Sequence, residues 1–167
     1  MPEVEMRRRI RELADTSGLD WRVLVEEVCM DWDLLKQVAA EPLCTIGAHT
    51  LTHPMLAKLS AAEMRHEIAQ SRTELEIRLG AKIEHFAYPV GDPGSAGQRE
   101  FEAVADLGFT SAVTTRPGMV FADHRLHSRA LPRLSVNGNW QDAKTLEVLL
   151  SGAPFALWNR GRKLNVA

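Results

Sequence analysis

Two histidines stand four residues apart in a short stretch of the sequence, Thr45–Leu56. Imidazole nitrogens are common zinc ligands, so His49 and His53 are candidates for a metal pair. In metalloproteases the same spacing lies on a continuous helix with a glutamate after the first histidine, but here Thr50 takes that place. Pro54 also disfavours the α region for His53. We therefore predict a loop in which the two rings converge within about 4 Å of each other.

The loop follows an apolar, β-prone segment, Leu43–Gly47, which predicts a buried strand. Ligand sites of α/β folds lie at the carboxyl ends of parallel strands, so the two histidines are in a suitable place. The competing interpretation is a pair of incidental polar residues. The spacing alone does not distinguish a metal pair from incidental polar residues, so the surrounding residues are needed as well.

The wider stretch IGAHTLTHPMLAKLS resembles the metal-binding motif of the polysaccharide deacetylases, also called nodulation-type deacetylases or the fourth family of carbohydrate esterases. A second stretch, His85–Gly91, resembles the family's aromatic-proline-glycine turn and follows after one predicted helix. The resemblance covers roughly residues 30–138. It implies a metal-dependent hydrolase that removes acetyl groups from N-acetyl sugars of a polysaccharide or glycolipid, with His49 and His53 holding the ion. Zinc is the first choice, and cobalt, nickel and manganese also suit such ligands.

The resemblance also implies roles for three further residues. Deacetylation passes through a tetrahedral oxyanion, which needs a hydrogen-bond donor besides the metal, and the backbone N–H of Tyr88 would supply it. Tyr88 and Pro89 would line the substrate groove. The stretch Leu131–Val136 looks like a late strand of the family, in which an arginine of some members orients a catalytic carboxylate, and Arg133 could inherit that role. An arginine on the surface or capping the core explains Arg133 equally well.

Two family motifs have no counterpart in the sequence. The first is a strand that ends in paired aspartates, one a metal ligand and the other the general base. Asp31 and Asp33 flank Trp32 in a predicted helical stretch and are poor substitutes. The last motif provides a histidine as general acid, but residues 154–159 contain none. Because the loss of a general base lowers the rate by a factor of roughly 10²–10⁴, we expect this chain alone to be inactive, as an incomplete domain with weak metal affinity.

Two alternatives therefore stay open. A catalytically dead domain of the same fold would bind carbohydrate or serve a structural role, and the unmatched aspartate motif favours it. A metal-binding interaction module would use His49 and His53 without hydrolysis. Tight metal binding with no affinity for sugars would distinguish the second alternative from the first.

The segments that position these residues alternate between strands and helices after residue 42. Besides the strand at 43–47, the sequence predicts helices at 60–79, 96–107 and 140–150 and strands at 83–88, 109–115 and 131–136. The capping box at Ser60–Glu63 begins the first of these helices, and Gly80 ends it. Such alternation is typical of parallel βα units. We predict an α/β fold over residues 42–167, a partial or distorted (β/α) barrel with parallel strands.

Residues 1–41 are predicted to form a helical segment that precedes the first strand. Apolar spacing indicates helices over 3–16, 19–29 and 32–40, the last with Asp31 as its N-cap. We expect this segment to pack on the α/β domain, so that the chain is one compact unit. If it leaves the edge of the strand at 43–48 uncovered, a homodimer across that open edge is the expected alternative.

Composition excludes several classes of partner. Charged residues make up 25% of the 167 residues and the net charge is −2, without the basic stripe of a nucleic-acid-binding protein. No apolar run reaches the length of a membrane span. The first residues show no basic start before an apolar stretch, so no signal peptide is predicted and a cytoplasmic location is the default expectation. The expected partner is a carbohydrate substrate.

Overall fold

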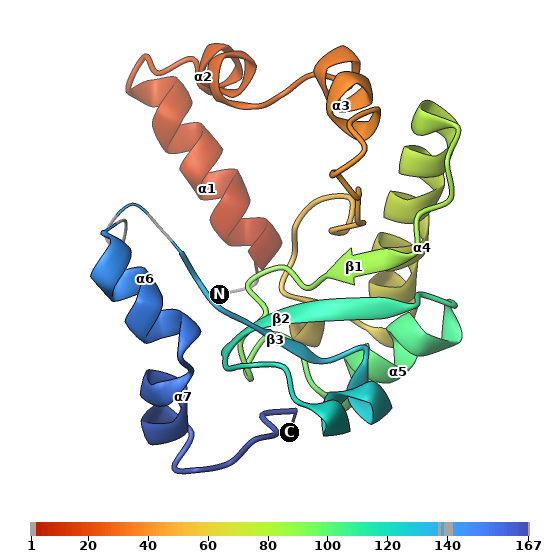
Figure 1. Ribbon diagram of the computed structural model, residues 1–167. Helices are drawn as coiled ribbons and strands as arrows, with labels where there is room; N and C mark the ends of the chain where they lie inside the picture. The colour runs from red at the N-terminus through yellow and green to blue at the C-terminus, as the bar shows by residue number, and fades with distance from the viewer. Residues whose placement is uncertain (1–2, 137, 139–141, 167) are drawn as a thin grey trace. The chain divides into compact units, whose positions relative to one another are not determined.

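The computed structural model describes residues 3–136, 138 and 142–166, so the predicted start of the last helix at 140 lies outside the described residues. The chain divides into two compact units, 1–45 and 46–167 (Figure 1). The sequence-based division into 1–41 and 42–167 stays a prediction. None of the described helices combines the length and the apolar character that crossing a membrane requires.

The first unit contains three helices, α1 (Glu3–Thr16), α2 (Trp21–Val28) and α3 (Trp32–Ala39). Their ranges agree with the predicted ones to within two residues. At the start of α3 the Asp31 carboxylate accepts a hydrogen bond from Leu34 N–H at 2.7 Å, which confirms the predicted N-cap. A side-chain cap of this kind satisfies an N–H group that has no partner inside the helix.

The second unit is built around a parallel sheet of three strands in the order β1 (His85–Ala87), β2 (Ser111–Pro117) and β3 (Leu131–Arg133). Phe86 pairs with Ala112 between the first two strands, and Val113 pairs with Leu131 between the last two. On the other side of β1, Ala48 forms a single parallel bridge with Phe86. The α/β class with parallel strands is therefore confirmed, and the described strands form an open sheet.

The predicted strand at 43–47 is wrong in extent. Strand pairing there is limited to Ala48, whose N–H donates to His85 O at 2.8 Å and whose carbonyl accepts from Ala87 N–H at 2.9 Å. Leu43 is fully exposed instead of buried. A β-prone residue is one that fits a pleated, half-buried surface, so an apolar run without a paired neighbour forms no ladder. β3 also ends earlier than predicted.

Helices α4 (Ala61–Leu79) and α5 (Gln98–Asp106) lie beside the sheet and contact each other (Figure 1). The capping box at the start of α4 is confirmed, because Ser60 Oγ accepts from Glu63 N–H and the Glu63 carboxylate accepts from Ser60 N–H at 3.0 Å. Gly80 ends the helix with a φ of 64°, a left-handed conformation that suits glycine. Both ends of α4 are therefore set by residues close in sequence.

Shorter elements complete the second unit: 3₁₀ helices at Leu56–Lys58 and Ala122–His127, α6 (Ala143–Leu150) and α7 (Ala153–Trp158). The sequence predicted α6 but not α7. Pro154 stands in the first turn of α7, where its missing N–H costs no intrahelical hydrogen bond.

The core lies between the sheet and helices α4 and α5. Its fully buried side chains include Phe86 from β1, Phe109 just before β2, Ile68 from α4 and Val104 from α5. The ring centroids of Phe86 and Phe109 are 5.4 Å apart, a favourable separation for aromatic rings. This packing holds the strands in place and leaves their carboxyl ends to carry the loops in which a site can form.

Candidate functional site

The two histidines are neighbours at the carboxyl edge of the sheet. His49 directly follows Ala48, the residue that pairs with β1. The ring centroids of His49 and His53 are 4.8 Å apart, and the ring planes are inclined by 74°. Both side chains are exposed and accessible to a ligand. The predicted loop thus brings the two imidazoles together, while their role as metal ligands stays a prediction.

The His49 ring is oriented by the neighbouring strand. His49 Nδ1 lies 2.8 Å from Ala87 O at the end of β1. Because a carbonyl oxygen can only accept, Nδ1 carries the proton of the neutral ring and Nε2 presents a lone pair. Metal-ligating histidines are commonly held in this way, with one ring N–H donated to a carbonyl or carboxylate. The geometry therefore suits His49 to bind an ion through Nε2.

The backbone of the histidine loop, residues 49–55, has an uncommon conformation. Thr50 has a φ of 65° and His53 a φ of 57°, both in the left-handed region that residues other than glycine rarely adopt. His53 lies outside the right-handed helical region, as predicted. Its N–H donates to Thr50 Oγ1 at 3.1 Å, which closes the loop between the two histidines. Strained residues persist where their surroundings hold them, and they cluster at functional sites.

Glu67 of α4 provides the main anchor of this loop. Its Oε2 accepts from Leu51 N–H at 2.9 Å and from Thr52 N–H at 3.0 Å, and its Oε1 accepts from the Thr52 hydroxyl at 2.7 Å. Hydrogen bonds to an ionised carboxylate are among the stronger ones in proteins. Glu67 was not predicted from the sequence. One signal was available: Glu67 stands one helical turn after Glu63, near the start of the helix that follows the loop.

The aromatic-proline turn begins with a buried tyrosine. Tyr88 is 2% exposed, its hydroxyl donates to Arg129 O at 2.8 Å, and burial raises the pKa of that hydroxyl far above its ordinary value. Its ring packs against Phe101 with the centroids 5.3 Å apart. Tyr88 N–H donates to Val113 O at 3.1 Å, which continues the pairing of β1 with β2. The predicted oxyanion donor is thus engaged in the sheet, and it can serve only by giving up this bond.

The residues after Tyr88 form a strained turn with an unused backbone donor. Gly91 N–H donates to Pro89 O at 2.7 Å, and Val90 between them has a φ of 63°. For a β-branched residue this φ is an outlier, and three-residue turns of this hand are rare. Among the described residues no hydrogen bond is made by Val90 N–H. Val90 N–H is therefore a backbone donor without a partner in the described part of the chain, and the sequence did not reveal it because only its backbone conformation is unusual.

The other predicted site residues are buried or distant. Pro89 is buried within the turn. Arg133 is exposed at the end of β3, opposite Pro117 of β2, and forms no ion pair with the described carboxylates. Since β1 and β2 separate β3 from Ala48, Arg133 lies three strand spacings of about 4.8 Å away from the histidine side of the sheet. The structure does not bring Arg133 to the histidines, and its role stays a prediction.

The donor atoms at this edge fit a divalent metal in part. Among the described residues, no group of three or more His, Cys, Asp or Glu side chains is arranged to hold a metal ion. His49 and His53 would therefore provide two of the four ligands that a tetrahedral zinc site needs. Both imidazoles are neutral when they bind a metal, so the compensating negative charge would come from another ligand.

Comparisons with known proteins gave a family match and several structures of similar fold. A family model described as polysaccharide deacetylase matches residues 11–112, more than half of the chain. A comparison with curated protein sequences gave no match. The solved structures that it resembles include the Streptococcus pyogenes deacetylase PplD in complex with acetate, at 21% identity and a TM-score of 0.63, with 77% of this chain and 54% of PplD covered.

Two further structures show the same likeness. IcaB from Ammonifex degensii is 22% identical with a TM-score of 0.54, and the match covers 72% of this chain and 52% of IcaB. The putative polysaccharide deacetylase BA0330 from Bacillus anthracis is 20% identical with a TM-score of 0.59, and the match covers 74% and 36%. At identities this low the likeness concerns the fold. The chain spans about half the length of PplD and IcaB.

Proposed function

Because the chain belongs to the polysaccharide deacetylase family, we propose that its site removes acetyl groups from N-acetyl sugars of a polysaccharide or glycolipid, with a divalent metal held by His49 and His53. The observation that carries the proposal is the geometry of the two imidazoles. Their ring centroids are 4.8 Å apart, and Ala87 O holds Nδ1 of His49 so that its Nε2 lone pair is left for a ligand.

Zinc is the first choice for this pair because it favours tetrahedral sites with imidazole ligands, and cobalt, nickel or manganese are alternatives. A bound divalent ion supplies Lewis acidity toward the acetyl carbonyl. The chain's own contribution is to position the ligands. Ala87 fixes the His49 ring, while Thr50 and Glu67 fix the backbone that carries His53.

The proposed oxyanion donor is Val90 N–H, which lies on the turn that follows Ala87 and uses no other acceptor in the described part of the chain. Tyr88 N–H is the alternative donor if the pairing of β1 with β2 opens at that point. Pro89 is buried in this turn and would line the edge of the substrate groove. Arg133 would orient a catalytic carboxylate that reaches the end of β3.

The open sheet would be part of a distorted (β/α) barrel, the architecture expected of the family whose model the chain matches. The edge beyond Ala48 would then accept a further strand, either from another polypeptide segment or from a second copy in a homodimer. Sedimentation at increasing protein concentration tests the homodimer, because a chain that stays monomeric throughout would contradict it.

A second function, carbohydrate binding without hydrolysis, is favoured by the composition of the donor set. In the part of the chain that the structure describes, no carboxylate joins His49 and His53 to make a third ligand. Two neutral imidazoles hold a divalent ion less well than a set that includes a carboxylate. Such a site would recognise the sugar while turning it over slowly or not at all.

Calorimetric titration of Zn²⁺ into the purified chain tests the metal pair. Even an outer partner of a metal ligand contributes about 10–100-fold in affinity, so we expect His49→Ala and His53→Ala to lose about 100-fold or more. His66→Ala is the matched control, because His66 is an exposed histidine of α4 outside the loop. Equal zinc affinity in all four proteins would overturn the metal pair.

Acetate release from N-acetylglucosamine oligomers with added Zn²⁺ separates the two functions. Release by the wild-type chain that disappears in His49→Ala, but not in His66→Ala, supports hydrolysis at the histidine loop. Oligomer binding without release supports the binding function. Neither release nor binding, in protein that binds zinc, would contradict both functions and leave the metal-binding interaction module.

A further inference from the structure

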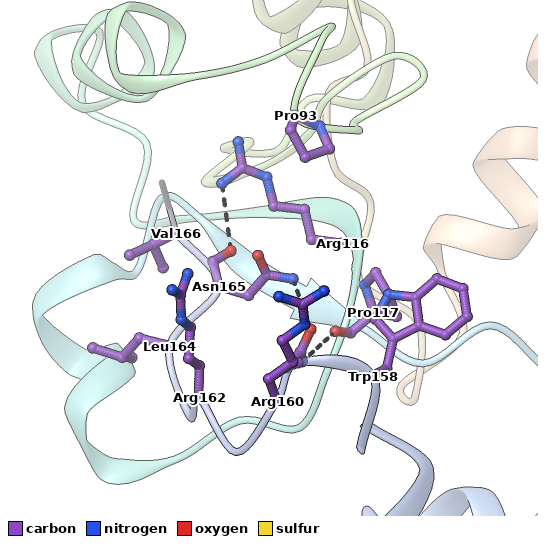
Figure 2. A pocket seen from close by; sticks show the side chains of 10 residues that line it. Pro93, Arg116, Pro117, Trp158, Arg160, Arg162, Leu164, Asn165 and Val166 are labelled. Carbon is purple, nitrogen blue, oxygen red and sulfur yellow. Dashed lines mark hydrogen bonds between the residues drawn. The ribbon is translucent and has the colours of Figure 1, made fainter. Parts of the chain in front are cut away.

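A cavity of ≈ 560 Å³ lies between the carboxyl end of β2 and the last residues of the chain (Figure 2). It lies within the unit 46–167. The polar and aromatic side chains that line it are three arginines, an indole ring and two amides: Arg116, Arg160, Arg162, Trp158, Asn159 and Asn165. Neither His49 nor His53 lines it, and neither does Val90. The lining of the cavity therefore includes neither the proposed metal ligands nor the proposed oxyanion donor.

Arg116 is a buried cation with no adjacent acidic partner among the described residues. It is 2% exposed, Nη2 donates to Ala96 O at 2.8 Å, Nη1 donates to Asn165 O at 3.4 Å, and Nε has no partner among the described residues. Asp92 favours the charged form of Arg116 only through space, because the Asp92 carboxylate accepts from Gly94 N–H at 3.0 Å and makes no ion pair.

A buried arginine without an adjacent carboxylate, such as Arg116, is unusual. Buried arginines are normally paired with carboxylates, because an unpaired charge in a low-dielectric interior is costly. Burial lowers the pKa of Arg116, and the Phe101 ring, 5.2 Å from the guanidinium carbon, offers only partial compensation. A buried polar group with unused hydrogen-bonding capacity commonly marks a missing ion or a functional role. A ligand oxyanion in the adjacent cavity would supply the partner.

Opposite the end of β2, the cavity is lined by the end of α7 and the residues that follow it. Asn159 Nδ2 donates to Pro117 O at 3.0 Å, which ties this segment to the end of β2. Arg160 follows with a φ of 52°, a strained turn that leads to Arg162. Trp158 adds an exposed aromatic ring. No aspartate or glutamate is among the described residues that line the cavity, and the charged side chains among them are all arginines.

We propose that this cavity binds an organic oxyanion, a carboxylate or phosphate group carried on a body of about sugar size. Guanidinium groups match the oxygens of carboxylates and phosphates with two parallel hydrogen bonds. The cavity volume falls in the range of small-molecule sites, about 300–1,000 Å³. Since a water molecule takes roughly 30 Å³, a bare inorganic anion would fill only a small part of it. The Trp158 ring offers an apolar surface for the remainder of the ligand.

Titration calorimetry with glucose 6-phosphate and with glucuronate tests the proposal, and glucose is the uncharged control. The protein is freed of metal beforehand, so that binding at the histidine loop cannot contribute. Sodium chloride keeps the ionic strength equal in every titration. We expect both charged sugars to bind and glucose not to bind, and we expect the affinity of the charged sugars to fall as salt is raised.

Two double variants locate the binding. Arg160→Gln with Arg162→Gln is expected to weaken binding about tenfold or more, because charge-assisted hydrogen bonds are lost. Arg78→Gln with Arg125→Gln is the matched control, since it removes the same charge from exposed arginines outside the cavity. Arg116→Lys keeps the buried charge but loses the planar fork, and it too is expected to bind more weakly. Circular dichroism verifies that each variant is folded.

The outcomes separate the possible ligand classes. Binding of glucose 6-phosphate alone assigns the cavity to phosphates, and binding of glucuronate alone assigns it to carboxylates. Either result supports the proposal if the Arg160→Gln, Arg162→Gln variant loses the affinity and the control variant keeps it. Glucose binding as tight as that of the charged sugars would overturn the proposal, and so would an equal loss in both double variants.

Discussion

Residues 1–45 and 46–167 both contain helices, but different interactions hold them. In the first unit, α1, α2 and α3 bury no residue, and apolar side chains such as Ile10, Leu13 and Val28 remain more than half exposed. In the second unit, Phe86 and Phe109 are almost completely buried in one core with residues of α4 and α5.

The difference shows where cooperative stability comes from. In α1, Arg8 and Arg9 each pair with Glu5 at 2.7 Å, but ion pairs at the surface contribute little. Helices as short as α2 and α3 are marginal in water without tertiary contacts. Burial of apolar surface is the dominant favourable contribution to folding. We therefore expect substitutions to affect the unfolding transition strongly in 46–167 and weakly in 1–45.

The largest expected effect is that of Phe109→Ala. Phe109 is fully buried, its ring is 5.4 Å from that of Phe86, and the Arg72 guanidinium carbon lies 3.5 Å from its centroid. Removing a buried phenyl ring typically lowers the free energy of unfolding by about 3–5 kcal/mol. Urea denaturation followed by circular dichroism measures the change. Ile10→Ala in α1 is the control, expected within about 0.5 kcal/mol of the wild type. Equal losses in the two variants would erase the contrast between the units.

A smaller effect is expected for Glu67→Gln. The amide keeps the shape of the side chain but loses the charge and one acceptor, so the three hydrogen bonds to Leu51 and Thr52 are weakened. We expect a loss of about 1–2 kcal/mol in the free energy of unfolding. We also expect zinc affinity to fall about tenfold, because Glu67 positions the loop that carries the histidines.

Thermal unfolding and zinc titration measure these two effects. Glu12→Gln in α1 is the matched control, because Glu12 pairs with Arg8 within the same helix. It should leave both quantities unchanged. If Glu67→Gln lowered stability but not zinc affinity, Glu67 would be a structural residue only.

The third prediction compares two N-caps. Ser60→Ala should lower the free energy of unfolding by about 1 kcal/mol, because the capping box of α4 belongs to the cooperative unit. Asp31→Ala removes an equivalent cap from α3, and we expect it to reduce helix content without moving the main thermal transition. Far-ultraviolet circular dichroism during a thermal scan records both quantities. A matching shift of the midpoint in the two variants would show that α3 unfolds together with the second unit.

The smallest effect concerns pH. Hydrogen bonds from the Ser60 side chain and backbone lower the pKa of Glu63 below its ordinary value of 4.5. A carboxylate with a depressed pKa stabilises the fold above its unfolded pKa, and this contribution is lost as the pH falls through the folded pKa. The midpoint difference between wild type and Glu63→Gln should therefore be present at neutral pH and disappear in acid. A difference that grew on acidification would contradict this sign.

Local features of the fold were predictable from the sequence. The caps at Asp31 and Ser60 and the stop at Gly80 occur as predicted, since each depends on residues within one helical turn. The loop between His49 and His53 was predictable for the same reason. The strand predicted at 43–47 was wrong, because a strand exists only where a neighbour pairs with it, and no residue within the run shows whether such a neighbour is there.

The sequence by itself determined the residues available for chemistry: two imidazoles four positions apart and a turn that contains proline and glycine. Tertiary structure decided how they are used. The contact of His49 with Ala87 O, the anchoring of the loop by Glu67 and the pairing of Tyr88 N–H with Val113 all join residues at least 15 positions apart. Backbone hydrogen bonds and carboxylate contacts of this range depend on how β1, β2 and α4 pack. The periodicity of a single segment indicates which helix or strand that segment can form, but it does not show which distant atoms the segment will contact.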